Sequence, residues 1–193
     1  MRWSRAVAPR VPDLSGSLLV DLPRGFIEME TATPSRVVAL PTTWFAELFL
    51  SLGAAAVTMA DKLSEPIARD ALEILDGEPD PTAEQVAWAV SLAMALRGLG
   101  VGHFERWGDV LTFVWRDPPA LEPSSHDFAA RFIARVVGDL SGVESHGAVI
   151  AQHERSLVVL LAGEACCREV RAQVQSGTPF RAILEQLYAE VAA

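Results

Sequence analysis

Two β-hairpin patterns, one on each side of an amphipathic helix, constrain the fold of this chain more than any other feature. The first runs through Val101–Trp107 and Val110–Arg116 around Gly108-Asp109, a two-residue loop that suits a type II′ turn. In the second run, apolar side chains point to both faces, which is typical of a strand that is covered on both sides. We therefore expect a central strand here, ended by Asp117-Pro118-Pro119 because proline cannot donate to a ladder.

The helix and the second hairpin follow directly. Between about His126 and Leu140, apolar residues recur at the spacing of one helical face. The second hairpin is predicted over 147–153 and 156–162, with Glu154-Arg155 at its turn. Because 158–161 is a continuous apolar run, its second strand is also expected to be buried.

The rest of the chain surrounds this unit with a β-rich beginning and with further helices. Residues 1–16 have no periodicity and are expected to be a flexible N-terminal arm. Residues 17–193 are predicted to form a single α+β domain. It consists of a β-rich segment at 17–40, helices over 42–98, and hairpin–helix–hairpin–helix over 101–193. The fold class is thus an antiparallel sheet from two hairpins flanking a long helix, covered by several helices.

Length, charge and cysteine content exclude several classes of protein. A chain of 193 residues can bury a stable hydrophobic core without disulfide bonds or structural metal ions. The net charge of −9 argues against a nucleic-acid partner, because phosphate binding needs a basic surface. No apolar run is long enough for a membrane span. The two cysteines, Cys166 and Cys167, are adjacent and cannot form disulfide bonds between distant segments, which favours a reducing compartment. We therefore predict an acidic cytoplasmic protein.

Candidate chemical groups are few. His103 and Glu105 share one face of a predicted strand, which leaves a His/carboxylate site open, although solvated or singly hydrogen-bonded side chains explain them more simply. Cys166 and Cys167 diverge by about 100° on a helix, so they do not easily bind one ion, and Cys166 has at most mild reactivity. No catalytic residue, metal or cofactor is therefore predicted.

A pocket for a small apolar ligand is a second hypothesis for the central unit. Such a pocket would lie between the long helix and the sheet. Four aromatic side chains would line it: Phe113, Trp115, Phe128 and Phe132. An aromatic set of this kind is more often part of the core, and that interpretation stays open.

A helix predicted from Thr42 to Leu63 carries a small-residue patch at 53–56, where another backbone could approach closely. Ser64 is expected to cap the following helix, with Pro66 in its first turn. The first helix is the predicted surface for self-association or for a protein partner. The expected contact residues are Trp44, Phe45, Leu48, Leu52 and Gly53.

The order of elements resembles a known superfamily. The points of likeness are Gly100-Val-Gly102 leading into a strand, the run 107–113, and the helix 128–142 ahead of the second hairpin. Over about residues 44–176 the chain resembles vinyl-reductase-type sensor domains and transport-particle vesicle-tethering subunits. Sensor-type members often carry spaced cysteines near the C-terminal strands, where this chain has only its adjacent pair. The resemblance implies a homodimerising domain that binds a small apolar molecule or a protein, without chemistry of its own.

Three functions follow from these features. The first is a non-enzymatic binding or scaffold module that acts through protein–protein interaction and self-association. The alternative is a small-molecule sensor with an apolar pocket. The third is an enzyme or accessory factor that uses His103, Glu105 or Cys166.

Overall fold

A computed structural model describes residues 18–21, 26–29, 35–37, 42–53, 55–75, 80–107 and 110–191 of the chain. The chain divides into two compact units, Met1–Leu40 and Pro41–Ala193. The predicted single domain over 17–193 spans both units and stays a prediction, and the predicted arm, residues 1–16, lies outside the described residues. The smaller unit contains three antiparallel strands in the order β1-β2-β3, namely β1 (Leu18–Asp21), β2 (Phe26–Met29) and β3 (Ser35–Val37).

The larger unit is built on a four-stranded antiparallel sheet. Its strands are β4 (Val101–Trp107), β5 (Val110–Arg116), β6 (His146–His153) and β7 (Ser156–Ala162), in the order β4-β5-β7-β6. Each predicted hairpin is present, and their second strands pair with each other at the centre of the sheet. The turn at 154–155 is where it was predicted, while residues 108–109 lie outside the described part. The predicted α+β class is confirmed.

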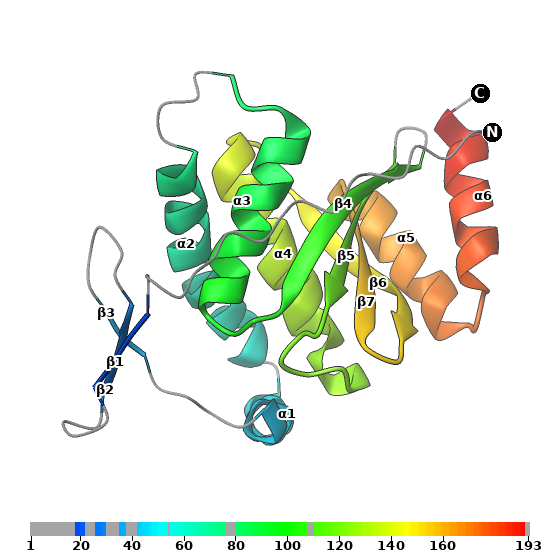
Figure 1. Cartoon of the computed structure of the whole chain (residues 1–193). Coiled ribbons are helices and arrows are strands. Elements are labelled where there is room, and N and C mark those ends of the chain that lie inside the picture. Colours follow the sequence, from blue (N-terminus) through cyan, green and yellow to red (C-terminus); the bar gives the residue numbers. More distant parts are fainter. Residues whose placement is uncertain are drawn as a thin grey trace. The chain divides into compact units, whose positions relative to one another are not determined.

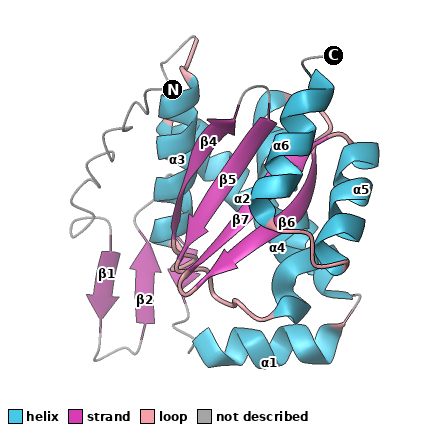
Figure 2. Cartoon of the chain, turned by 90° about the vertical axis from the view of Figure 1, so that its right-hand side faces the viewer, coloured by secondary structure: helices cyan, strands magenta, loops and turns pink. Residues whose placement is uncertain are grey.

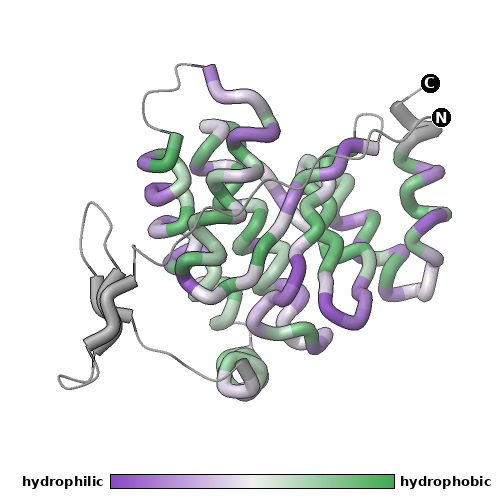
Figure 3. The backbone as a smooth tube through the Cα atoms, viewed as in Figure 1, coloured by the Kyte–Doolittle hydropathy of each residue, from purple (hydrophilic) through white to green (hydrophobic). Residues whose placement is uncertain are grey.

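Helices cover both faces of this sheet (Figure 1). One face carries α2 (Ala55–Ile74), α3 (Ala83–Leu96) and α4 (His126–Ser141), and the other carries α5 (Glu164–Gln175) and α6 (Phe180–Val191). In Figure 2, α5 and α6 lie in front of the strands and α4 lies behind them. The central strands are largely hydrophobic, as Figure 3 shows. The hydrophobic residues of β5 and β7 are buried on both faces because these two strands have a helical layer on each side.

The helical segment before the sheet breaks at a different place from the one predicted. Helix α1 (Thr42–Leu52) ends at Gly53, which has a φ of +50°, and α2 then runs without interruption through Ser64 and Pro66. The prediction of one helix from Thr42 to Leu63 was therefore wrong. Glycine enters the left-handed region with little strain, so it ends α1, whereas the Ser64 hydroxyl donates to the Asp61 carbonyl at 3.0 Å within α2.

Close contacts and ion pairs fasten the layer of α2, α3 and α4. A Cβ at Gly147 would lie 2.3 Å from the carbonyl oxygen of Ala130, so β6 and α4 approach as closely as only glycine allows. Asp61 of α2 binds Arg131 of α4 through two hydrogen bonds of 2.7 and 3.2 Å. Helices α2 and α3 are joined by the buried carboxylate of Asp70 and the guanidinium of Arg97.

Candidate ligand-binding site

A row of neighbouring aromatic rings extends from the sheet to helix α1; two of its pairs are stacked and the pair of Phe128 with Phe49 is tilted at 33°. The Trp115 ring lies 5.3 Å from Phe132, Phe132 lies 5.7 Å from Phe128, and Phe128 lies 4.4 Å from Phe49 (centroid distances). Phe128 and Phe132 are four residues apart on α4 and therefore share one helical face. We call these four side chains the aromatic row. At its inner end, the indole Nε1–H of Trp115 donates to the Leu99 carbonyl at 2.6 Å.

The structure brings together three of the four predicted pocket residues. Trp115, Phe128 and Phe132 belong to the aromatic row, whereas the Phe113 ring contacts Phe104 at 5.1 Å. All four are buried in one hydrophobic core. Because interior side chains are close-packed, burial of this degree also fits the simpler interpretation as core, and a ligand-binding role for the whole set stays a prediction.

A cavity of about 370 Å³ lies at the outer end of the aromatic row. The end of α1, the beginning of α2, the 3-10 turn η2 (Pro123–Ser125) and the first turn of α4 surround it. Its lining residues are Phe49, Leu50, Gly53, Ala56, Val57, Ser124, Asp127 and Phe128.

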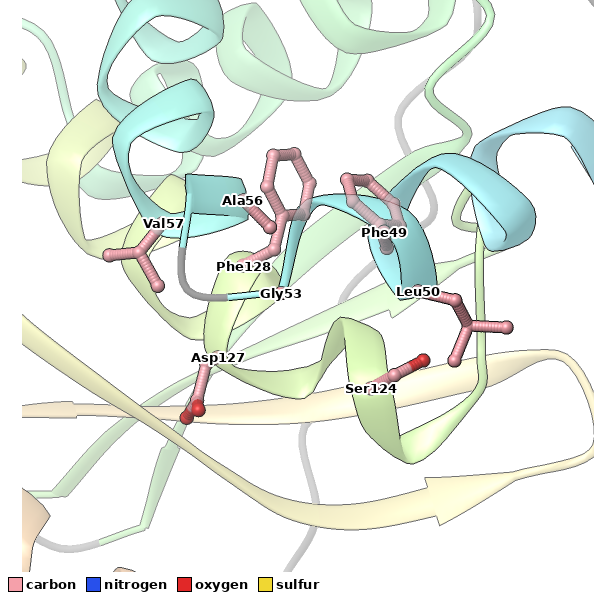
Figure 4. Close-up of a pocket in the computed structure, with 8 residues that line it drawn as sticks. All are labelled: Phe49, Leu50, Gly53, Ala56, Val57, Ser124, Asp127 and Phe128. Atoms are coloured by element: carbon pink, nitrogen blue, oxygen red, sulfur yellow. The ribbon is translucent and has the colours of Figure 1, made fainter.

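The lining combines apolar walls with two polar groups. Figure 4 shows the rings of Phe49 and Phe128 side by side, on one side of the Gly53 backbone. The Ser124 hydroxyl and the Asp127 carboxylate lie on the other side of it. A serine hydroxyl donates or accepts a hydrogen bond and a carboxylate accepts one, so the site offers apolar contact together with a partner for one polar substituent.

Most of these lining residues were not predicted from the sequence. Phe128 alone belongs to the predicted pocket, and Gly53 was predicted as part of an interface. Ala56 belongs to the small-residue patch at 53–56, whereas Val57 and Ser124 carry no sequence signal, because only the crossing of separate segments brings them together. The glycine at position 53, which ends α1, is the local sequence feature that marks the position of the cavity.

The predicted interface residues on α1 divide into two groups. Trp44 is 52% exposed, and Gly53 is exposed as well. Phe45, Leu48 and Leu52 are half-buried, and Phe45 and Leu52 pack against the core. Of the five predicted interface residues, Trp44 and Gly53 are exposed, and self-association through α1 stays a prediction.

The predicted chemical groups form local pairs. Nε2 of His103 lies 3.1 Å from Oε1 of Glu105, whose Oε2 accepts the Trp107 Nε1–H at 3.3 Å. Cys167 is buried and Cys166 is half-buried. Burial raises the pKa of the Cys167 thiol to about 11, so this thiol stays protonated at neutral pH. Within the described ranges, no group of three or more His, Cys, Asp or Glu side chains could hold a metal ion.

Comparison with known proteins bears on the fold. No family model matches the chain, and no curated protein sequence matches it. A solved structure with the same fold is the phenol-responsive sensory domain of the transcription activator PoxR, solved with phenol. The likeness has a TM-score of 0.55 at 12% identity, and it covers 78% of this chain and 87% of that domain.

At 12% identity this likeness shows the fold alone, and both predicted functions, the scaffold module and the small-molecule sensor, stay predictions. Membership of the vinyl-reductase-type superfamily stays a prediction, as does any part in vesicle tethering. Among the helices that the structure describes, none is long and apolar enough to cross a membrane.

Proposed function

We propose that residues 41–193 form a small-molecule sensory domain, which binds an apolar ring compound in the cavity between α1, α2 and α4. The observation that carries the proposal is the cavity itself, which borders the rings of Phe49 and Phe128. The fold that this chain shares with a phenol-responsive domain gives independent support. Neither observation requires the domain to carry out chemistry.

The size and polarity of the cavity limit the ligand. An apolar cavity of about 150 Å³ is large enough to bind benzene, so about 370 Å³ leaves room for one substituted ring. A hydroxyl substituent would find a partner in Ser124 or Asp127. A ligand with so few atoms has limited contact area, so we expect a Kd between roughly micromolar and millimolar.

The proposal is tested by titrating the full chain with phenol and with cyclohexanol, using calorimetry. In parallel, Val57→Trp places a large side chain in the wall of the cavity. We expect this variant to bind the probe at least about tenfold more weakly. Val143→Trp is the matched control, because Val143 is 66% exposed, lies outside the cavity and should leave binding unchanged. Unchanged affinity in Val57→Trp would place the ligand elsewhere and contradict the proposal.

A further inference from the structure

Helix α1 is fastened to its unit differently from α2, α3 and α4. Ion pairs join the other three helices to one another, through Asp61 with Arg131 and Asp70 with Arg97. Among the described side chains of α1, 43–52, the one hydrogen bond runs from Ser51 Oγ to a carbonyl of the same helix at 2.8 Å. Apolar contacts therefore hold α1 in place, and such contacts are non-directional.

One of these contacts forms the inner wall of the cavity. The Phe49 ring is 1% exposed and lies 4.4 Å from Phe128, at the outer end of the aromatic row. Its neighbour Leu50 is 65% exposed, yet it lines the same cavity. The cavity thus begins where the Phe49 ring ends, and withdrawal of that ring would add its volume to the cavity and uncover Phe128.

The cavity also lies at a joint in the chain. Gly53 connects α1 to the segment that leads into α2, and it has a φ of +50°. A Cβ built there meets nothing within 4 Å, and two backbone hydrogen bonds hold the residue, from its N–H to the Phe49 carbonyl at 3.1 Å and from the Ala56 N–H to its carbonyl at 3.0 Å. Hinges are often a few such positions at the ends of elements, where a change in backbone dihedral angles is absorbed.

We propose that the Phe49 ring occupies the ring site of the ligand and that α1 is a lid that this ring holds shut. A planar apolar ring compound enters by displacing Phe49 from the face of Phe128, and α1 then turns about Gly53. Because one ring replaces another, Phe128 keeps an aromatic neighbour on this side in both states. This inference rests on the proposed function, and it adds the preference for a planar ring and the element that responds to it.

A ligand shifts the equilibrium towards the open state of α1 only by as much as it binds that state more tightly than the closed one. Planar probes should therefore bind better than saturated ones of similar size, because only a planar ring can replace the aromatic contact of Phe49 with Phe128. We expect phenol to bind the full chain at least about fivefold more tightly than cyclohexanol. Hydrogen exchange of the α1 amides should become faster in the presence of phenol, with no such change in α4.

Two variants test the lid itself. Phe49→Ala vacates the ring site, so phenol should bind about tenfold more tightly and the α1 amides should exchange faster. Phe104→Ala is the matched control, because it removes a ring that pairs with Phe113 and lies outside the aromatic row. The second variant, Phe49→Leu, keeps an apolar side chain in the core but removes the planar ring, so phenol should bind at least about threefold more tightly.

The outcomes separate this inference from the proposed function. If the wild type binds phenol but neither Phe49→Ala nor Phe49→Leu changes its affinity by threefold, the lid is wrong and the proposed function stands. Equal affinity for phenol and cyclohexanol would overturn the ring site in the same way. If the wild type binds neither probe, both the proposed function and the lid are wrong. Should Phe49→Ala fail to fold, Phe49→Leu decides alone.

Discussion

The two helical layers bury the sheet with different chemistry. The layer of α2, α3 and α4 is built around aromatic rings, with Trp115 and Phe132 at its centre. The layer of α5 and α6 is mainly aliphatic and contains one buried thiol; its buried members are Val110, Ala148, Ile150, Val158, Leu160, Cys167, Val170, Ile183 and Leu184. Branched aliphatic side chains interdigitate closely, whereas large flat rings pack in fewer arrangements. The described cavity borders the aromatic layer, so we expect ligand-dependent changes there and little change in α5 and α6.

The largest expected effect comes from removing a ring at the centre of the aromatic layer. Phe132→Ala should lower the free energy of unfolding by about 3–5 kcal/mol, because the side chain is fully buried and leaves a void between Trp115 and Phe128. Phe180→Ala is the matched change in the other layer. Phe180 is half-buried, at 6.3 Å from Trp107, so about 1–2 kcal/mol is expected. Urea unfolding of both variants measures the difference, and equal losses would show that the two layers do not differ in this way.

The next effect tests the close approach of α4 to the sheet. Gly147→Ala would place a methyl group 2.3 Å from the Ala130 carbonyl oxygen, which is backbone and cannot rotate away. We expect a loss of about 1–3 kcal/mol from this overpacking.

Gly163→Ala, at the N-cap of α5, is the control for that variant. It meets nothing within 4 Å at an ordinary φ of −68°, so it should change stability by less than about 0.5 kcal/mol. Thermal or urea unfolding measures both. A tolerated Gly147→Ala would mean that α4 can move away from β6, and the layer would then be looser than the ion pairs suggest.

Ion pairs within the aromatic layer give a smaller effect. Asp70→Asn leaves the guanidinium of Arg97 without its charged partner in a largely buried position, so about 2 kcal/mol of stability should be lost. Asp61→Asn breaks the pair with Arg131, but both of those side chains are more than a third exposed. Water screens that pair, and less than about 1 kcal/mol is expected. If Asp61→Asn is as costly as Asp70→Asn, the tie between α2 and α4 is stronger than its exposure indicates.

Local signals predicted the framework of this fold. Thr82 and Gln85 form the hydrogen bonds of a capping box at 3.2 and 2.7 Å, and a capping box is readable from four adjacent residues. The hairpins were predictable for the same reason, because a period of two and a turn lie within one short window. The break at Gly53 was missed because Ser64 and Pro66 resemble a stronger helix start, although tertiary packing carries α2 through both.

The site was less predictable, because its parts meet only through long-range packing. Phe128 and Phe132 share a helix face, so their joint position follows from spacing alone. The contact of Phe128 with Phe49 depends instead on how α1 crosses the beginning of α4, and sequence spacing carries no information about that crossing. The same holds for Ser124 and Val57, which line one cavity from two different helices.

The last effect is absent at neutral pH, because it is a pH dependence that comes from the aliphatic layer. Burial raises the pKa of the Cys167 thiol to about 11, whereas an unfolded chain has a cysteine pKa of about 8.5. At neutral pH the Cys167 thiol is protonated in both the folded and the unfolded state, so its contribution to stability is fully present. Above about pH 9 the unfolded state loses the proton first, so stability should fall by up to about 1.4 kcal/mol per pH unit until about pH 11.

Cys167→Ala should remove this part of the slope. Cys166→Ala should keep most of it, because burial is the larger cause of the raised Cys167 pKa and the neighbouring Cys166 the smaller one. Urea midpoints measured from pH 8 to 11 test the assignment. The aromatic-layer variants should share the wild-type slope, because none of them changes the surroundings of this thiol. A slope that survives in Cys167→Ala would instead place the titrating group outside the α5–α6 layer.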